Sequence, residues 1–141
     1  MPITPNVNAD LHLLVVNDNP VARRLLLQLL REVGYFKVSE AADGQMALRA
    51  FKSARAIGAP LDLVITDCAM PLMDGLTLVA QMRNDTQLRG VPVLMVTAEA
   101  TRESILRAAE AGADDYLVKP YTSEKLRQKI DGLLVRYSLH A

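Results

Sequence analysis

Four short apolar runs in this chain each lead into polar residues whose side chains suit phosphoryl chemistry. These polar residues are Asn17, Asp18, Asp67, Thr97 and Lys119. Two carboxylates beside a hydroxyl and an ammonium can hold a divalent metal ion and a phosphoryl group, because Mg²⁺ prefers one or two carboxylates together with water and phosphate oxygens. A carboxylate that attacks phosphorus forms an acyl phosphate. The sequence therefore indicates phosphoryl transfer, provided that the fold brings these residues together.

The apolar runs are predicted to be buried parallel strands. They are rich in Leu, Val and Ile, which is typical of strands that helices cover on both faces. Amphipathic helical segments separate them, so the pattern is five strands alternating with five helices. The strands are expected at about 11–16, 38–41, 61–66, 92–97 and 115–118. Parallel sheets place their chemistry at the carboxyl ends of the strands, which is where the polar residues stand.

Capping residues mark where the predicted helices begin. They are Asn19 before Pro20, Asp74 and Thr101. A further helix is expected after the Asp43-Gly44 turn, and the last helix is expected to start after Thr122. Residues 1–10 are expected to form a flexible arm, because they include two prolines among polar residues. One domain is expected over 11–139, and because the last helix reaches almost to Ala141, no output domain is expected after it.

Composition argues against several classes of protein. Lys and Arg together number 16 and so do Asp and Glu, so no charge imbalance favours nucleic acid or anionic lipid. Cys68 is the only cysteine, which excludes a disulfide framework and a cysteine zinc site. No apolar stretch is long enough to span a membrane, and the N-terminus does not resemble a secretory signal. We expect a protein of the reducing cytoplasm, with no nucleic acid partner and no membrane insertion.

Each acidic candidate also has a plain structural explanation. Asp67 alone could cap a turn, but Asp74 is the obvious cap of the next helix, which leaves Asp67 free to be a nucleophile. Asp18 is likewise not needed as a helix cap, because Asn19 can cap the first helix, so its carboxylate is free to bind a metal ion. Metal binding would relieve the repulsion between two such acids.

Thr97 and Lys119 differ in how distinctive they are. Thr97 taken alone is best explained as a β-branched residue that fits a sheet. Lys119 would ordinarily be a solvated lysine, yet it stands between an apolar strand and Pro120, where it can pair with a carboxylate or phosphate. A cis Lys119–Pro120 bond would aim it into the site.

In their order and spacing, these residues resemble the receiver domain of bacterial two-component response regulators. The resemblance covers about residues 11–137. The motifs that carry it are Leu14-Val15-Val16-Asn17-Asp18, Ile65-Thr66-Asp67, Met70-Pro71, Met73-Asp74-Gly75, Thr97-Ala98-Glu99-Ala100, Ala111-Gly112-Ala113 and Lys119-Pro120. The resemblance implies an α/β, flavodoxin-like, doubly wound fold with five helices, in which the five parallel strands have the order 2-1-3-4-5.

The resemblance also implies the chemistry of the site. Asp67 would accept a phosphoryl group from a phosphohistidine on a sensor histidine kinase or a histidine phosphotransfer protein. Asp18, Asp67 and the backbone carbonyl of Ala69 would ligate Mg²⁺. Lys119 would contact the phosphoryl oxygens.

The same resemblance implies a switch. Thr97 would also contact the phosphoryl group, and Tyr116 would turn inward when Thr97 moves. The face made by the fourth helix, fifth strand and fifth helix would then change its affinity for a downstream protein, in chemotaxis or in a phosphorelay.

Asn17 departs from the family pattern, which usually has an acid there. It would reach the metal through water, so we expect weaker Mg²⁺ binding. The departure leaves a second hypothesis open, a phosphorylation-independent interaction module with the receiver fold. An enzyme such as an aspartyl-phosphate phosphatase of the haloacid dehalogenase type is not expected, because it needs an acid two residues after the nucleophile and position 69 is alanine.

Overall fold

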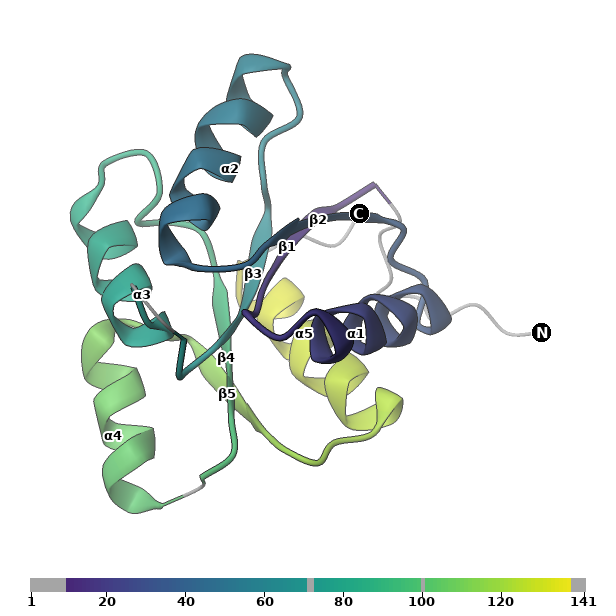
Figure 1. Ribbon diagram of the computed structural model, residues 1–141, viewed down its shortest axis with the longest axis vertical. Helices are drawn as coiled ribbons and strands as arrows, with labels where there is room; N and C mark the ends of the chain where they lie inside the picture. Colours follow the sequence, from purple (N-terminus) through teal and green to yellow (C-terminus); the bar gives the residue numbers. More distant parts are fainter. Residues whose placement is uncertain (1–9, 71–72, 100, 138–141) are drawn as a thin grey trace.

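Five parallel strands form one sheet in the order β2-β1-β3-β4-β5 in the computed structural model (Figure 1). The structure describes residues 10–70, 73–99 and 101–137. The strands are β1 (His12–Val16), β2 (Lys37–Ala41), β3 (Leu63–Asp67), β4 (Val93–Thr97) and β5 (Asp115–Val118). The helices are α1 (Pro20–Glu32), α2 (Gly44–Ala56), α3 (Gly75–Asn84), α4 (Arg102–Ala111) and α5 (Ser123–Tyr137). The predicted flavodoxin-like fold is confirmed.

Helices cover both faces of this sheet. α1 and α5 pack on one face, and α2, α3 and α4 pack on the other (Figure 1). Side chains alternate between the faces along each strand, so every central strand contributes side chains to the hydrophobic core on each face. In β1, Leu13 and Val15 face α1 and α5, whereas Leu14 and Val16 face the opposite core. Burial on both sides explains why the strands are apolar throughout.

The predicted caps begin the helices that they precede. Asn19 Oδ1 accepts hydrogen bonds from the backbone N–H groups of Val21 and Ala22, at 2.9 and 3.1 Å. Asp74 Oδ1 accepts one from Thr77 N at 2.8 Å. Asp74 is therefore the cap of α3, and Asp67 has no capping role in it.

β3 differs from its predicted range at both ends. It begins at Leu63 and not at residue 61. Before this point the Asp62 carboxylate accepts a hydrogen bond from the backbone N–H of His12 at 2.9 Å, so a side chain stands in for the backbone carbonyl that would otherwise extend the strand pairing. It also extends one residue further than expected, so Asp67 is the last residue of the strand and pairs with Val96.

Other predicted ranges agree with the structure to within one residue, apart from segments that the structure does not describe. β4 begins at Val93, after Pro92, which has no N–H to donate to a ladder. The arm expected at 1–10 lies outside the described residues except for Asp10, and so do Pro71 of the Met70-Pro71 motif, Ala100 and the predicted domain end at 138–139. In the described part of the chain, none of the helices has the length and apolar character that a membrane crossing requires.

Candidate functional site

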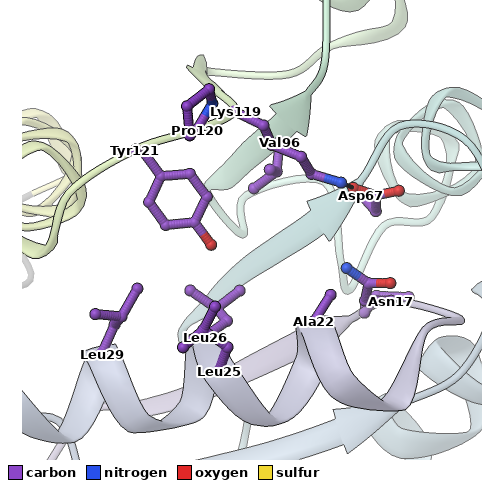
Figure 2. Close-up of a pocket in the computed structure, with 11 residues that line it drawn as sticks. Asn17, Ala22, Leu25, Leu26, Leu29, Asp67, Val96, Lys119, Pro120 and Tyr121 are labelled. Atoms are coloured by element: carbon purple, nitrogen blue, oxygen red, sulfur yellow. Dashed lines mark ion pairs between the residues drawn. The ribbon is translucent and has the colours of Figure 1, made fainter.

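Asn17, Asp67 and Lys119 lie on the face of the sheet that α1 and α5 cover. The residues two positions earlier in the chain belong to the core on that face; they are Val15, Ile65 and Leu117. Because strand side chains alternate with a period of two, the three polar residues continue the same face beyond this core. They line one cavity at the carboxyl ends of β1, β3 and β5 (Figure 2).

Lys119 and Asp67 form the centre of the site. Lys119 Nζ lies 2.7 Å from Asp67 Oδ1, and the two side chains are 39% and 12% exposed. The contact is a close ion pair, and the buried Oδ1 accepts no hydrogen bond from any other described residue. A carboxylate oxygen has more than one acceptor site, so Oδ1 keeps capacity for a further ligand. The Lys119–Pro120 peptide bond is cis.

The backbone around Asp67 is held closely. Its carbonyl oxygen accepts a hydrogen bond from Thr66 Oγ1 at 3.1 Å. Gly75 packs against the same carbonyl, and a Cβ at position 75 would lie only 2.2 Å from that oxygen and 3.0 Å from Met95 Sδ. Gly75 also donates its N–H to Cys68 O at 2.9 Å. Only glycine allows α3 to start this close to the end of β3.

Asn17 and Asp18 occupy different environments. Asn17 is 7% exposed, and its Oδ1 accepts a hydrogen bond from Asn19 N at 2.9 Å. Asp18 is exposed and is not among the described residues that line the cavity. Asn17 is therefore the member of this pair that lines the cavity with Asp67 and Lys119, and Asp18 is its exposed neighbour in the chain.

Thr97 and Tyr116 belong to the opposite face of the sheet. Tyr116 pairs with Met95, and both pack in the core beneath α2, α3 and α4. The Thr97 hydroxyl donates to Glu99 O at 3.0 Å and accepts from Glu99 N at 3.1 Å. The half-buried Tyr116 ring lies under Lys129 Nζ, 4.8 Å from the ring centre. The hydroxyl of Thr97 is thus engaged by the loop that follows β4, and not by Asp67.

The cavity has an apolar part that the sequence analysis missed. The whole cavity has a volume of about 250 Å³, and its apolar part lies between α1 and the segment after β5. Its apolar walls are Val16, Ala22, Leu25, Leu26, Leu29, Val96, Pro120 and Tyr121. The helical spacing of the α1 members was visible in the sequence, but that spacing is equally typical of a core.

Tyr121 forms the side of the cavity opposite α1 (Figure 2). Burial raises the pKa of the Tyr121 hydroxyl, and the negative charge of Asp67 raises this pKa further. Tyr121 therefore remains protonated at neutral pH, and its hydroxyl, which points toward α1, can act as a hydrogen-bond donor inside the cavity (Figure 2).

The family model of the response regulator receiver domain matches residues 13–131. The chain belongs to this family. A receiver domain is a switch protein of two-component signalling and not a classical enzyme.

The receiver domain has close relatives among chemotaxis proteins. It is 41% identical to chemotaxis protein CheY-3 of Vibrio cholerae serotype O1 over 130 residues, which covers 92% of this chain and 96% of that protein. It is also 41% identical to chemotaxis protein CheY of Pseudomonas aeruginosa over 124 residues, or 88% of this chain and 96% of that protein.

Solved structures agree with this assignment. The high-resolution structure of Vibrio cholerae CheY4 has a TM-score of 0.76 at 34% identity, with 88% of this receiver domain and 98% of that chain covered. A chain of the CheX–CheY–BeF₃–Mg²⁺ complex from Borrelia burgdorferi has a TM-score of 0.80 at 25% identity, with 92% and 96% covered.

The residues present fit a magnesium ion. The described part of the receiver domain contains no group of three or more His, Cys, Asp or Glu placed to hold a metal. Mg²⁺ does not need such a cage, since one or two carboxylates with water and phosphate oxygens satisfy it. Asp67 offers a buried oxygen without a hydrogen bond, and Asp18 offers an exposed carboxylate next to the cavity residue Asn17. This donor set is sufficient for Mg²⁺ and too small for a dedicated calcium site.

Proposed function

We propose that this receiver domain accepts a phosphoryl group on Asp67 and changes its binding to a partner protein in response. The donor would be a phosphohistidine of a sensor histidine kinase or a histidine phosphotransfer protein. The observation that carries the proposal is the ion pair of Asp67 with Lys119, in which Oδ1 is buried and has no hydrogen bond. A carboxylate held in this way is a nucleophile with a cation already beside it.

In the transfer step, a carboxylate oxygen of Asp67 forms a bond to phosphorus while the phosphorus–nitrogen bond of the phosphohistidine breaks. The imidazole nitrogen keeps the electron pair and leaves. Lys119 stays within reach of the added negative charge, because its Nζ already lies 2.7 Å from the carboxylate. Charge-assisted contacts of this kind favour the acyl phosphate over a solvated phosphoryl group.

Magnesium would be held by Asp18, by Asp67 and by the backbone carbonyl of Ala69. When bound, the ion would neutralise negative charge on the phosphoryl oxygens. Lys119 supplies a further positive charge beside the carboxylate, so the two cations would share this role.

The switch would operate through Thr97 and Tyr116. The Thr97 hydroxyl must leave the backbone of Glu99 to reach a phosphoryl oxygen. Tyr116 pairs with Met95, two residues before Thr97 on the same face of the sheet, so the two side chains are diagonal neighbours. Moving a two-state element from nearly off to nearly on takes about 5.5 kcal/mol. Two or three hydrogen bonds to a charged group, at about 1.5–3 kcal/mol each, are enough to supply this.

The surface that changes would be the face formed by α4, β5 and α5. Tyr116 and Lys129 lie on this face, and they touch each other as a cation–π pair. The relatives are chemotaxis proteins, and one solved relative is held in a complex with CheX, which favours a protein as the downstream partner. We place the receiver domain in chemotaxis or a phosphorelay of the reducing cytoplasm.

The test is incubation with a small phosphodonor and Mg²⁺, followed by intact mass measurement. The wild-type chain should gain one phosphoryl mass, and Asp67→Ala should gain none. Equal gains in both would mean that another residue is modified and would contradict the proposal.

A second candidate function rests on Asn17. Because this position lacks the usual acid, the chain could be an interaction module that keeps the receiver fold and works without phosphorylation. This alternative predicts no mass gain in the wild-type chain, together with partner binding that Asp67→Ala leaves unchanged.

A further inference from the structure

We propose that Asn17 serves this site as a hydrogen-bond donor to the group carried by Asp67, and not as an acceptor toward the metal. This inference rests on the proposed function and adds a positioning role to it. It replaces the expectation that Asn17 reaches Mg²⁺ through water.

The direction of the Asn17 side chain carries the proposal. Its Oδ1 accepts the backbone N–H of Asn19 at 2.9 Å, which fixes which end of the carboxamide is oxygen, because a backbone N–H can only donate. Figure 2 shows the result, in which the nitrogen lies on the cavity side and the oxygen is turned away. The NH₂ group makes no hydrogen bond with any residue of the described chain, and it is not one of the buried polar atoms that lack a partner, so it is open to the cavity that Asn17 lines.

Hydrogen bonds to the backbone of Asn17 also fix the position of this residue. Asn17 N donates to Ala41 O at 3.0 Å, and Asn17 O accepts from Arg23 Nη1 at 2.8 Å. Asn17 is therefore held at three points, two on its backbone and one at its carboxamide oxygen, and its NH₂ group is left to face the cavity. Asp67 lines the same cavity, and its Oδ1 accepts no hydrogen bond from any described residue besides its ion pair with Lys119, so a group carried by Asp67 would lie within a cavity that also contains this donor.

The donor also compensates for the missing acid. With Asn17 in place of a carboxylate, Asp18 and Asp67 carry the negative charge near Lys119, and the cavity attracts a divalent cation less strongly. One unit charge about 5 Å from Mg²⁺ in a watery site changes its affinity by roughly tenfold. A donor at position 17 helps instead to hold the anionic phosphoryl oxygens.

The experiment uses the full chain with Mg²⁺ and beryllofluoride, a mimic of the phosphoryl group. The side-chain NH₂ signals of Asn17 are assigned by nitrogen NMR from their loss in Asn17→Asp. They should stay in place with Mg²⁺ alone, then shift and exchange more slowly with solvent once beryllofluoride binds. Fluorine NMR reports independently whether the adduct forms, and Asp67→Ala should abolish its signal.

Asn17→Asp is a clean variant, because its carboxylate can still accept the N–H of Asn19. It should bind Mg²⁺ roughly tenfold more tightly, because it restores an acid. It should bind beryllofluoride about tenfold more weakly at saturating Mg²⁺, because it loses a donor to a charged group. Asn19→Asp is the matched control, since it adds the same charge two residues away without touching the NH₂ group, and its affinity for beryllofluoride should stay near that of the wild type.

Two results would overturn the inference while leaving the proposed function intact. One is an adduct that forms without moving the Asn17 NH₂ signals, and the other is an Asn17→Asp variant that binds beryllofluoride as tightly as the wild type. The absence of any adduct in the wild-type chain would instead refute the proposed function, and this inference with it.

Discussion

Gly75 shows how the residues around Asp67 leave no spare room. The carbonyl of Asp67 contacts the glycine on one side and accepts the Thr66 hydroxyl on the other. The position of the proposed phosphoacceptor is therefore set by its backbone as well as by Lys119. At this scale, a single methyl group is enough to move it.

Gly75→Ala should destabilise the fold by about 1–3 kcal/mol, because its Cβ would overlap the Asp67 carbonyl and the neighbours must shift. It should also slow phosphorylation from a small donor. Denaturant unfolding and the rate of mass gain measure the two effects.

Gly132→Ala is the matched control for that prediction. Gly132 is exposed in the middle of α5, and a Cβ there would meet no atom within 4 Å. Alanine at this helix position should stabilise the chain by about 0.5–1 kcal/mol. If the two variants behaved alike, close packing against Asp67 would not be the reason for glycine at position 75.

At the scale of elements, the sheet separates two groups of residues by face. Asn17, Asp67 and Lys119 continue the face of α1 and α5, whereas Thr97 and Tyr116 belong with the opposite helices. β4 contacts both groups of residues. Val96 lines the cavity with Asp67, whereas the next residue, Thr97, contacts the loop before α4. Adjacent residues of one strand thus link the proposed phosphoacceptor to the proposed switch.

Thr97→Val should uncouple these two groups. Valine keeps the β-branched shape but removes the hydroxyl that bonds the Glu99 backbone and, by the proposal, the phosphoryl group. The variant should still form the beryllofluoride adduct, whereas NMR shift changes over α4, β5 and α5 should fall to less than half of those in the wild type. Unchanged shifts across that face would rule out Thr97 as the link.

Across the whole molecule, Asp114 joins elements that lie far apart in the sequence. Its Oδ2 accepts from Arg83 Nη2 on α3 at 2.8 Å and from Val93 N on β4 at 2.7 Å. Its Oδ1 accepts from the Tyr137 hydroxyl at the end of α5. The Asp114 side chain is only 12% exposed, so this network is partly shielded from water.

Asp114→Ala should lower the free energy of unfolding by about 3 kcal/mol, because it removes the carboxylate that pairs with Arg83 and leaves the Val93 N–H without its acceptor. Glu103→Ala is the comparison, since Glu103 pairs with Arg107 on the exposed surface of α4. That loss should stay below about 0.5 kcal/mol. Equal losses in denaturant unfolding would contradict the account of the Asp114 network.

Tyrosines distributed over the fold predict a loss of stability in alkali. Burial, followed by the charge of Asp131, raises the pKa of Tyr35; burial and then a hydrogen bond to Asp114 raise that of Tyr137. The folded state holds these protons more tightly than the unfolded state. Their stabilising contribution is therefore complete below the unfolded pKa of about 10 and is lost as the pH rises above it.

Melting temperature measured between about pH 8 and 11 checks this prediction. Each tyrosine whose pKa is raised in this way should lower the free energy of unfolding by at most about 1.4 kcal/mol for each pH unit above its unfolded pKa. Tyr35→Phe should show a smaller fall in melting temperature between about pH 8 and 11 than the wild type. It should not destabilise the protein at neutral pH, because the buried Tyr35 hydroxyl has no hydrogen bond within the described residues. A melting temperature that stays flat to pH 11 would contradict the prediction.

Apolar runs and capping residues such as Asn19 and Asp74 predicted most element ends, since these signals act locally. The order of the strands was predicted by the resemblance to receiver domains and not by any local pattern. The sequence also predicted that Asp67 and Lys119 would meet, because both end strands of one parallel sheet. It could not show that Thr97 faces away from Asp67 or that Tyr121 and α1 enclose an apolar cavity. Those features depend on strand register and on helix placement, which no local pattern specifies.

The central claim is that Asp67 becomes an acyl phosphate. Borohydride reduces an acyl phosphate to an alcohol, so treating the chain after incubation with a phosphodonor and Mg²⁺ marks the modified residue for peptide mass mapping. We predict reduction at Asp67 alone, dependent on both the donor and Mg²⁺. Reduction at Asp18, or no reduction at any carboxylate, would contradict the account.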